Sequence, residues 1–351
     1  MAQMKTEGAS HYDIQNERRD AQKQLWRKHQ TALIKGDSVA MLDSPHRRTR
    51  RGIYKGPEGE STSVLMDASV HEISPGITTT THRHSWDAIM FVIGGSGWTE
   101  IGGQRIEFKP WDTIHIPAWE WHRHGNTGTK DVRYFTWSME PMLEWFGLAT
   151  LEDAGDEAPA DLPPPPTSGA LSDLFGLDGG DPYTRRLTRL VTSDEQATSR
   201  RLHTAWDDVT QRVSRRGARS SFLVDSSLGY QTSGLSAVMH ELAPGLWQAQ
   251  HRHGGEAHLY IVSGNGHTKV DGVPHHWTSG DLAVVDHWCW HQHCNDDPDK
   301  TARVIRVHST FGTLMRALMH PLPILEEDPD RDRPDLSNVV WPDPNIDRPE
   351  A

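Results

Sequence analysis

Cysteine is nearly absent from this sequence, and so is any long apolar run. The 351 residues include only two cysteines, Cys289 and Cys294, which are too few for a disulfide framework. The first seven residues lack the apolar segment of a signal peptide, and no stretch approaches the roughly 20 apolar residues of a membrane span. These absences predict a soluble, cytoplasmic protein with no membrane partner.

Basic charge is also scarce, with 36 Lys and Arg against 48 Asp and Glu and a formal net charge of −12. This balance argues against a nucleic-acid partner and favours a small or neutral ligand. Tyrosine (6) and phenylalanine (7) are few, whereas histidine (22) and tryptophan (14) are abundant. The histidine excess indicates metal or proton chemistry, and ordinary surface histidines are the alternative explanation.

A histidine-bearing unit occurs twice. The first copy contains His82-Arg83-His84 and His122-Arg123-His124, and the second contains His251-Arg252-His253 and His291-Gln292-His293, 169 residues later. Between residues 71 and 126, 18 of 56 positions carry the same residue as the position 169 further on, without a gap. Chance would match about one position in fifteen. The chain therefore contains a duplicated domain, and a repeat of this length is a domain with its own core.

Short alternating or β-branched runs, separated by Gly, Pro and Asp, begin near residue 63 and again near residue 222. Such runs are typical of a sandwich or barrel. We predict an all-β fold with a few peripheral helices and two tandem barrels. The expected divisions are an N-terminal arm and helix (1–59), the first barrel with a closing helix (60–151), an acidic Pro/Gly-rich linker (152–190), a helix plus the second barrel (191–320) and a C-terminal tail (321–351).

Helical spacing of apolar residues predicts packing helices over residues 15–34 and 193–213, and short helices over 141–151 and 311–319. The linker is expected to hold one anchored turn at 171–175, and residues 326–334 are expected to form an exposed arm. The basic run from Arg47 to Arg51 is interpreted as a solvated or subunit-facing surface, with anion binding as the alternative.

The paired His-x-His motifs favour a metal site. Residues i and i+2 of a strand face the same way, about 6.6 Å apart, so His82 and His84 project to one face while Arg83 projects to the other. Two imidazoles from one strand and a third from another make three ligands of one ion and leave two or three positions open. An open site of this kind is what a catalytic metal needs.

The motif Pro-Gly-x5-His-x-His, followed by Asp-x4-Pro-x4-His-x3-Asn, resembles the two signatures of the cupin superfamily, and the duplication resembles the bicupins. The second copy departs from the pattern at Asp286, where the first has Pro117. The resemblance implies a double-stranded β-helix (jelly-roll) barrel around each metal. It also implies the ligands His82, His84 and His122 in the first copy and His251, His253 and His291 in the second.

Many cupins place a glutamate ligand where this chain has Ala88 and Ala257. Both copies therefore predict all-histidine triads, which leave the full charge on the ion and favour an anionic chelating substrate. Asp87 and Glu256 stand one residue earlier, and strand alternation points them away from the metal unless a bulge turns them inward. With that proviso they are candidate catalytic residues.

Within the all-histidine cupins, the text His82-Arg83-His84-Ser85-x-x-Ala88, then Gly95-x-Gly97, then His122-x-His124-x-Asn126, is similar to gentisate 1,2-dioxygenases and their salicylate and hydroxynaphthoate relatives. The resemblance implies Fe(II), with Mn(II) as the alternative, at no more than one ion per barrel. It implies cleavage of a C–C bond in an aromatic acid or phenolic substrate with O2. His124, with His293 as its second-copy counterpart, would donate or accept a proton.

Candidate substrate contacts are Trp86, Met90, Trp119 and Trp121. Met90 occupies the slot where the family often has an arginine that grips the substrate carboxylate, and the three tryptophans are candidates for the walls of a flat pocket or for the core. A zinc knuckle at Cys289-x-His291-x-His293-Cys294 is disfavoured because the first copy has Glu120 and Gly125 at the cysteine positions. His267, His275 and His276 are expected on the surface.

Three functional classes stay open. The leading hypothesis is the ring-cleaving dioxygenase, and the alternatives are a non-oxidative metal-dependent bicupin, such as a decarboxylase or isomerase, and a non-catalytic small-molecule-binding bicupin. The family resemblance favours the first copy as the catalytic one, whereas Glu256 and His258 give the second copy the more polar strand. The helices and terminal arms suggest a homo-oligomer.

Overall fold

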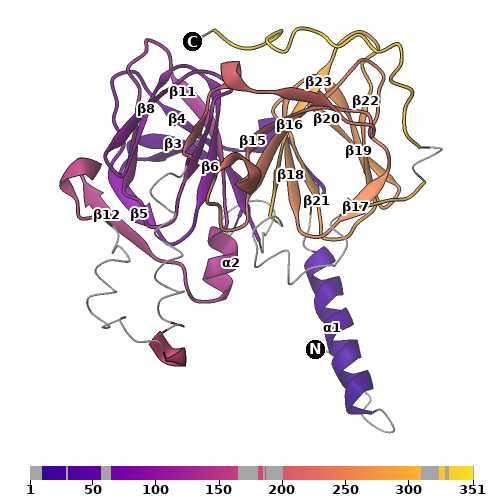
Figure 1. Cartoon of the computed structure of the whole chain (residues 1–351), viewed down its shortest axis with the longest axis horizontal. Coiled ribbons are helices and arrows are strands. Elements are labelled where there is room, and N and C mark those ends of the chain that lie inside the picture. Colours follow the sequence, from indigo (N-terminus) through magenta and orange to yellow (C-terminus); the bar gives the residue numbers. More distant parts are fainter. Residues whose placement is uncertain are drawn as a thin grey trace.

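Two β-barrels lie side by side in the computed structural model of the chain, and they contain every strand among the described residues (Figure 1). The structure describes residues 10–28, 31–56, 65–164, 181–184, 186, 201–309, 324–328 and 332–350. The predicted all-β class with a few helices and two tandem barrels is confirmed. None of the helices in these ranges is long and apolar enough to cross a membrane.

The first barrel consists of a seven-stranded and a five-stranded antiparallel sheet. The larger sheet has the order β13 (His203–Thr204), β9 (Thr113–Ile116), β6 (Ala88–Gly94), β11 (Val132–Ser138), β4 (Asp67–Ile73), β3 (Thr49–Lys55) and β2 (Leu42–Ser44). The smaller has the order β12 (Leu151–Gly155), β5 (Thr81–His84), β10 (His122–Gly125), β7 (Gly97–Ile101) and β8 (Gln104–Phe108). Because β2 and β3 belong to it, this barrel starts before the expected boundary at residue 60.

The second barrel repeats this plan. Its larger sheet has the order β1 (Leu33–Ile34), β21 (Leu282–Val285), β18 (Ala257–Ser263), β23 (Ala302–His308), β16 (Ser236–Leu242), β15 (Arg219–Val224) and β14 (Gln211–Val213). Its smaller sheet has the order β20 (Val273–Thr278), β19 (Asn265–Val270), β22 (His291–Asn295), β17 (His251–His253) and β24 (Ile324–Glu326). The equal strand order is the structural counterpart of the ungapped repeat.

Each barrel donates one short edge strand to the other. Leu33 and Ile34 pair with β21 of the second barrel, and His203 and Thr204 pair with β9 of the first. An open sheet edge is satisfied by backbone hydrogen bonds, and here the neighbouring barrel supplies them. The two barrels are therefore tied together by reciprocal strand exchange.

Strand alternation divides the core into three parts. On β6, Ala88 and Met90 face the interior of the first barrel, whereas Ile89 and Phe91 face the second barrel. The cluster between the barrels contains side chains of both halves, including Phe135 and Tyr260, whose ring centroids lie 4.4 Å apart. A third cluster fills the second barrel. The large shared cluster holds the two barrels in one fixed arrangement.

The N-terminal helix differs from its prediction at both ends. Helix α1 spans His11–Lys28 rather than 15–34, and Figure 1 shows it projecting away from both barrels instead of packing on them. Leu33 and Ile34, which the periodicity assigned to the helix, are the edge strand β1. The short helix predicted over 141–151 is α2 (Glu140–Trp145), and the chain then enters β12.

The segments predicted between and after the barrels are partly wrong. Within the expected helix over 193–213, the described part forms β13, a 3-10 turn (Trp206–Asp208) and β14. There Trp206 packs edge-on against Trp111, with ring centroids 5.1 Å apart, and this contact belongs to the core shared by the two barrels. The first residues of the expected linker form β12, which pairs with β5, and part of the expected tail forms β24, which pairs with β17. These two segments are therefore barrel strands rather than exposed arms. The turn at 171–175 and the helix at 311–319 lie outside the described residues.

Candidate metal centre

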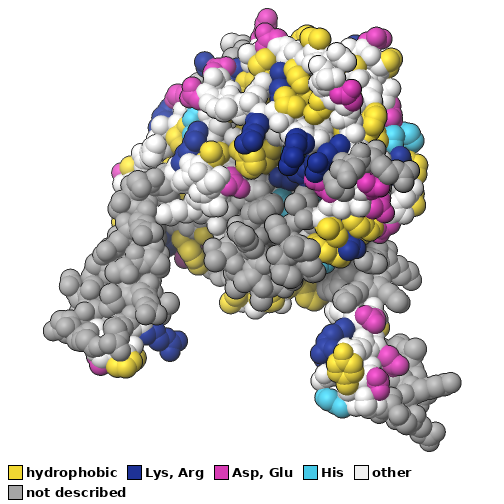
Figure 2. All heavy atoms as spheres, turned by 45° about the vertical axis from the view of Figure 1, so that its right-hand side comes forward, with side chains coloured by type: hydrophobic (Ala, Val, Ile, Leu, Met, Phe, Trp, Pro, Cys, Tyr) yellow, Lys and Arg dark blue, Asp and Glu magenta, His cyan; other side chains and the backbone are white. Residues whose placement is uncertain are grey.

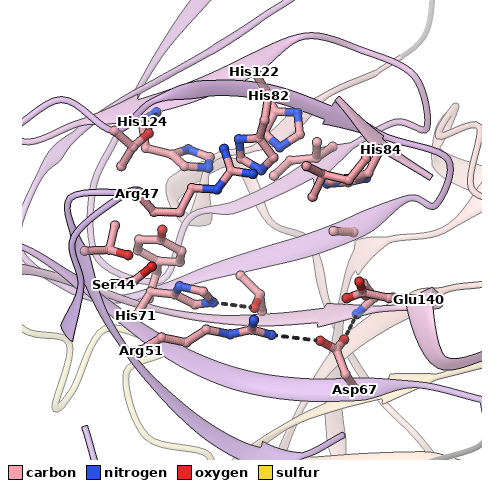
Figure 3. A pocket seen from close by; sticks show the side chains of 18 of the residues that line it. Ser44, Arg47, Arg51, Asp67, His71, His82, His84, His122, His124 and Glu140 are labelled. Atoms are coloured by element: carbon pink, nitrogen blue, oxygen red, sulfur yellow. Dashed lines mark hydrogen bonds and ion pairs between the residues drawn. The ribbon is translucent and has the colours of Figure 1, made fainter. Parts of the chain in front are cut away.

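Three histidines of the first barrel converge. His82 and His84 lie on β5, and His122 lies opposite His82 on the neighbouring strand β10. One ring nitrogen of each lies within 4.8 Å of the others, and Figure 3 shows the three rings gathered at one end of the pocket. The residues implied as first-copy ligands are therefore brought together.

Backbone carbonyls orient these rings. Each Nδ1 lies against a carbonyl oxygen, which can only accept a hydrogen bond, so Nδ1 carries the proton and Nε2 keeps its lone pair. The bonds join His82 to Thr80 (3.4 Å), His84 to Trp86 (2.6 Å) and His122 to Glu120 (2.8 Å). Metal-binding histidines are commonly fixed in this way through their other nitrogen.

The electrostatics keep the triad neutral. Burial lowers the pKa of His84 to about 4 and lowers the pKa values of His82 and His122 well below the ordinary histidine value. The buried Ala88 offers no donor where other cupins have a carboxylate. Three neutral, preoriented nitrogens on one side of a cavity fit a divalent transition metal with open coordination positions.

The second barrel repeats the triad. His251 and His253 on β17 and His291 on β22 also present ring nitrogens within 4.8 Å of one another, and all three side chains are buried. His308 differs from the first copy: its Nε2 lies 2.8 Å from Nδ1 of His253. Both triads were found from sequence, but their surroundings differ.

The first triad opens on a cavity of about 220 Å³. All three triad histidines line it, together with His124, Trp86, Arg47, Arg51, His71 and Tyr134. The larger cavity of the second barrel, about 700 Å³, is lined by none of His251, His253 and His291. Only the first of these two cavities therefore combines a triad with room for a ligand.

Two arginines of this cavity were missed as site residues. Arg47 donates hydrogen bonds to Thr80 (3.1 Å) and Asp153 (2.7 Å), and its charge adds to burial in lowering the pKa of His82. Arg51 forms an ion pair with Asp67 at 3.2 Å. The surface interpretation of this basic run was wrong for Arg47, whose side chain is 22% exposed, whereas Arg51 is 37% exposed and also lines the cavity. The alternative interpretation of the run, anion binding, was the sequence signal that could have identified these arginines as site residues.

His124 also lies in the cavity. Its Nδ1 is 2.9 Å from the hydroxyl of Thr99, which is itself 3.3 Å from the Arg123 carbonyl. If that hydroxyl donates to the carbonyl, Nδ1 of His124 must donate to it, and Nε2 is left as an acceptor facing the cavity. His293 makes the equivalent contact with Thr268 at 3.0 Å.

The catalytic assignment of Asp87 and Glu256 is corrected. Asp87 accepts hydrogen bonds from His115 (3.2 Å) and from Ser233 of the other barrel, and Glu256 pairs with Lys55 of the first barrel and with His258. Neither carboxylate lines the cavity at the first triad. Strand alternation turns both into the interface, and no bulge turns them back.

The four candidate substrate contacts lie in different places. Trp86 lines the cavity and stacks on His84, with ring centroids 4.5 Å apart. Met90 is fully buried in the first barrel's core and does not line the cavity. Trp119 and Trp121 do not line it either, because they pack on the guanidinium of Arg83 on the opposite face of β5. Only Trp86 is placed to contact a ligand there.

The remaining sequence candidates lie apart from the triads. Cys289 is buried and Cys294 is half-buried, neither forms a disulfide, and neither belongs to a described metal-ligand group. His276 is exposed, as expected, but His267 is half-buried and bonds to Asp296 at 2.8 Å. These two histidines and Asp296 form an outer His-His-Asp group.

Comparison with protein families finds the cupin domain twice, over residues 69–138 and 238–308. Each of these segments contains the paired histidine motifs of its copy. Each barrel also includes strands that lie outside the matched segment. The predicted bicupin organisation is confirmed.

Two of the curated relatives with the longest matches are dioxygenases. The chain is 25% identical over 250 residues to a 5-aminosalicylate 1,2-dioxygenase of Comamonas sp, a match that covers 68% of this chain and 64% of the relative. It is 24% identical over 280 residues to a 1-hydroxy-2-naphthoate 1,2-dioxygenase of Nocardioides sp. (strain KP7), covering 76% of this chain and 66% of the relative. The matches thus span just under two thirds of these relatives' own lengths.

Among solved structures, a salicylate 1,2-dioxygenase variant from Pseudoaminobacter salicylatoxidans in complex with gentisate superposes with a TM-score of 0.59. The superposition covers 93% of this chain and 98% of that chain at 17% identity. At this identity the likeness establishes a shared fold.

Proposed function

Because this chain is a protein of two cupin domains that resembles gentisate-type dioxygenases, we propose that it is a metal-dependent dioxygenase that cleaves a C–C bond of a hydroxylated aromatic carboxylate with O2. One observation carries the proposal: in the first barrel, an all-histidine triad and two arginines line the same cavity. The triad suits a chelating ligand, and the arginines suit its carboxylate. The relatives named above support the reaction class.

We assign the reaction to the first barrel. Its cavity is lined by His82, His84 and His122, so a ligand in it reaches the triad directly. At about 220 Å³ this cavity is the smaller of the two, and it is the one that contains the triad. In the second barrel none of the three triad histidines lines the large cavity.

The first triad would hold the metal through the Nε2 atoms that the backbone carbonyls leave free. Fe(II), or Mn(II) as the alternative, suits imidazole nitrogens together with oxygen ligands. When bound, such an ion supplies a redox-active centre with coordination positions for O2 and for a chelating substrate.

Arg47 would orient the substrate carboxylate. Its side chain is 22% exposed and lines the cavity, and its hydrogen bonds to Thr80 and Asp153 hold it in place without a bidentate partner. A planar guanidinium binds a carboxylate through two parallel hydrogen bonds. This residue fills the role that the family gives to the position of Met90, from a different segment of the chain.

His124 and Trp86 would position the ring. Nε2 of His124 is available to accept a hydrogen bond from a substrate hydroxyl. It would thereby accept the hydroxyl proton, which must leave when that oxygen binds the metal. Trp86 stacks on His84 and offers an apolar wall beside the triad.

Oxygen uptake tests the proposal. The full chain is loaded with Fe(II) under anaerobic conditions and mixed with O2 and each of salicylate, gentisate, 5-aminosalicylate and 1-hydroxy-2-naphthoate. We expect stoichiometric O2 consumption and a ring-opened product with at least one of them. Uptake with none of the four refutes the proposal, and turnover without O2 would favour the decarboxylase or isomerase alternative.

A matched pair of variants separates the barrels. His84→Ala and His253→Ala remove equivalent ligands of the two triads. We expect His84→Ala to abolish uptake and lose metal, and His253→Ala to keep at least half of the activity. The opposite result would place the chemistry in the second barrel.

A further inference from the structure

The second barrel contains a cavity of about 700 Å³ that the proposed reaction does not use. Six arginines line it, whereas its acidic lining residues are only Asp208 and Glu326. The arginines are Arg201, Arg212, Arg215, Arg216, Arg306 and Arg333. In a chain with a formal net charge of −12, this is an unusual local excess of positive charge. Figure 2 shows Lys and Arg side chains gathered across the middle of the face drawn there.

The duplication places this cavity where the first barrel has its metal pocket. Five positions line both cavities and are related by the same offset of 169 residues. They are Ser44 and Val213, Arg47 and Arg216, Arg51 and Ser220, His71 and His240, and Thr79 and Gln248. The second cavity is therefore a diverged copy of a ligand pocket rather than a chance gap on the surface.

One strand position marks the divergence. On β11, Thr136 pairs with Ser69, and on β23, Arg306 pairs with Val238, the counterpart of Ser69. Thr136 and Arg306 therefore occupy equivalent places in the two pockets. The guanidinium that replaces the threonine adds a cation to the second pocket.

The positive charge of the cavity is poorly compensated. Glu326 is already paired with Arg333 at 2.8 Å. The Nε atom of Arg306 is buried, and among the described residues it has no hydrogen-bond partner. A buried donor without a partner costs about 1–3 kcal/mol, which an acceptor oxygen in the cavity would remove.

We propose that this cavity is a second ligand site, which binds an oxyanion with at least two negative charges, as a dicarboxylate or a phosphate-bearing molecule. Arg216 faces it from the loop after β14 and Arg306 faces it from β23, and guanidinium forks match carboxylate and phosphate oxygens. The volume lies within the range of about 300–1,000 Å³ found for small-molecule sites. The site is independent of O2 chemistry in the first barrel.

Isothermal titration calorimetry of the full-length protein tests the proposal, with succinate and inorganic phosphate as separate probes at low ionic strength. We expect one of them to bind at one site per chain, and to weaken as NaCl is raised, because the recognition is between charges. Succinate binding identifies a dicarboxylate site, and phosphate binding identifies a phosphate site. If neither probe binds, the proposal is wrong.

Equivalent variants locate the bound anion. Arg216→Gln and Arg306→Thr, the latter restoring the first-barrel residue, are each expected to weaken binding at least tenfold, whereas Arg47→Gln leaves the affinity within twofold. The reverse pattern would place the anion in the first barrel and overturn the proposal. Because Arg306 is partly buried, its replacement can also disturb the fold, so Arg212→Gln at the exposed rim of the cavity is a second check. We expect this variant to bind the anion two- to threefold more weakly and to leave the circular dichroism spectrum unchanged. An unchanged affinity in all three second-barrel variants would also overturn it.

Discussion

Replacement of Lys55 by methionine tests the most consequential ion pair between the barrels. Lys55 on β3 pairs with Glu256 of the second barrel, and the two side chains are 0% and 1% exposed. His258 bonds to the same carboxylate. Removal of the lysine leaves a buried carboxylate that, in the described part of the chain, is paired only with His258. We therefore expect Lys55→Met to destabilise the protein by about 3–5 kcal/mol at pH 7.

The pKa of Glu256 gives an independent magnitude. Burial raises this pKa, but the charges and hydrogen bonds of Lys55 and His258 outweigh burial and lower it from 4.5 to about 2. A group whose pKa is depressed on folding stabilises the protein above its unfolded pKa and loses that contribution as the pH falls toward the folded pKa. At about 1.4 kcal/mol per pKa unit, the contribution at neutral pH is on the order of 3 kcal/mol.

The assay is urea unfolding between pH 7 and pH 3, followed by tryptophan fluorescence. We expect the wild type to lose stability below about pH 4.5, and Lys55→Met to lose less over the same interval because its Glu256 pKa is no longer held down. Lys130→Met, at an exposed lysine, is the control and should change stability by no more than about 0.5 kcal/mol.

The double variant Lys55→Met with Glu256→Gln removes both charges and should recover most of the loss. A cost below about 1 kcal/mol for Lys55→Met would refute the buried pair. Glu256→Gln alone also tests the corrected assignment. We expect it to retain kcat within threefold at 25 °C, and a hundredfold fall would return Glu256 to the catalytic residues.

Three further outcomes follow from the site and the core. Arg47→Gln should lower kcat/KM for the aromatic carboxylate by 10- to 100-fold, corresponding to about 1.5–3 kcal/mol for a charge-assisted pair, with metal content unchanged; an unaltered kcat/KM would exclude Arg47 from substrate binding. A chelator should lower the melting temperature of the metal-loaded wild type, with recovery on addition of Fe(II), while His84→Ala with His253→Ala shows no such response in calorimetry. Trp206→Ala should cost about 3–5 kcal/mol in denaturant titration, because this buried ring packs in the shared core; a loss under 1 kcal/mol would contradict that packing.

Some parts of the fold were predictable because they depend on local pattern. The duplication fixed two domains of the same plan, and the spacing of His82 and His84 placed both rings on one face of a strand before any contact was known. The same periodicity misled over residues 203–213, where apolar spacing compatible with a helix serves two edge strands and a turn. A short segment adopts the conformation in which neighbouring strands can pair with its backbone and pack against its side chains.

The sequence by itself determined the duplicated barrels, the metal-ligand candidates and the absence of a carboxylate ligand, since these follow from residue identity and from spacing along single strands. Only the tertiary structure decided that Arg47 and Arg51 enter the pocket, that Asp87 and Glu256 join the barrels, and that Arg306 faces the second cavity. Those roles depend on which distant strand packs against each side chain. That choice is made by burial and by charge pairing across the whole chain, which local periodicity does not record.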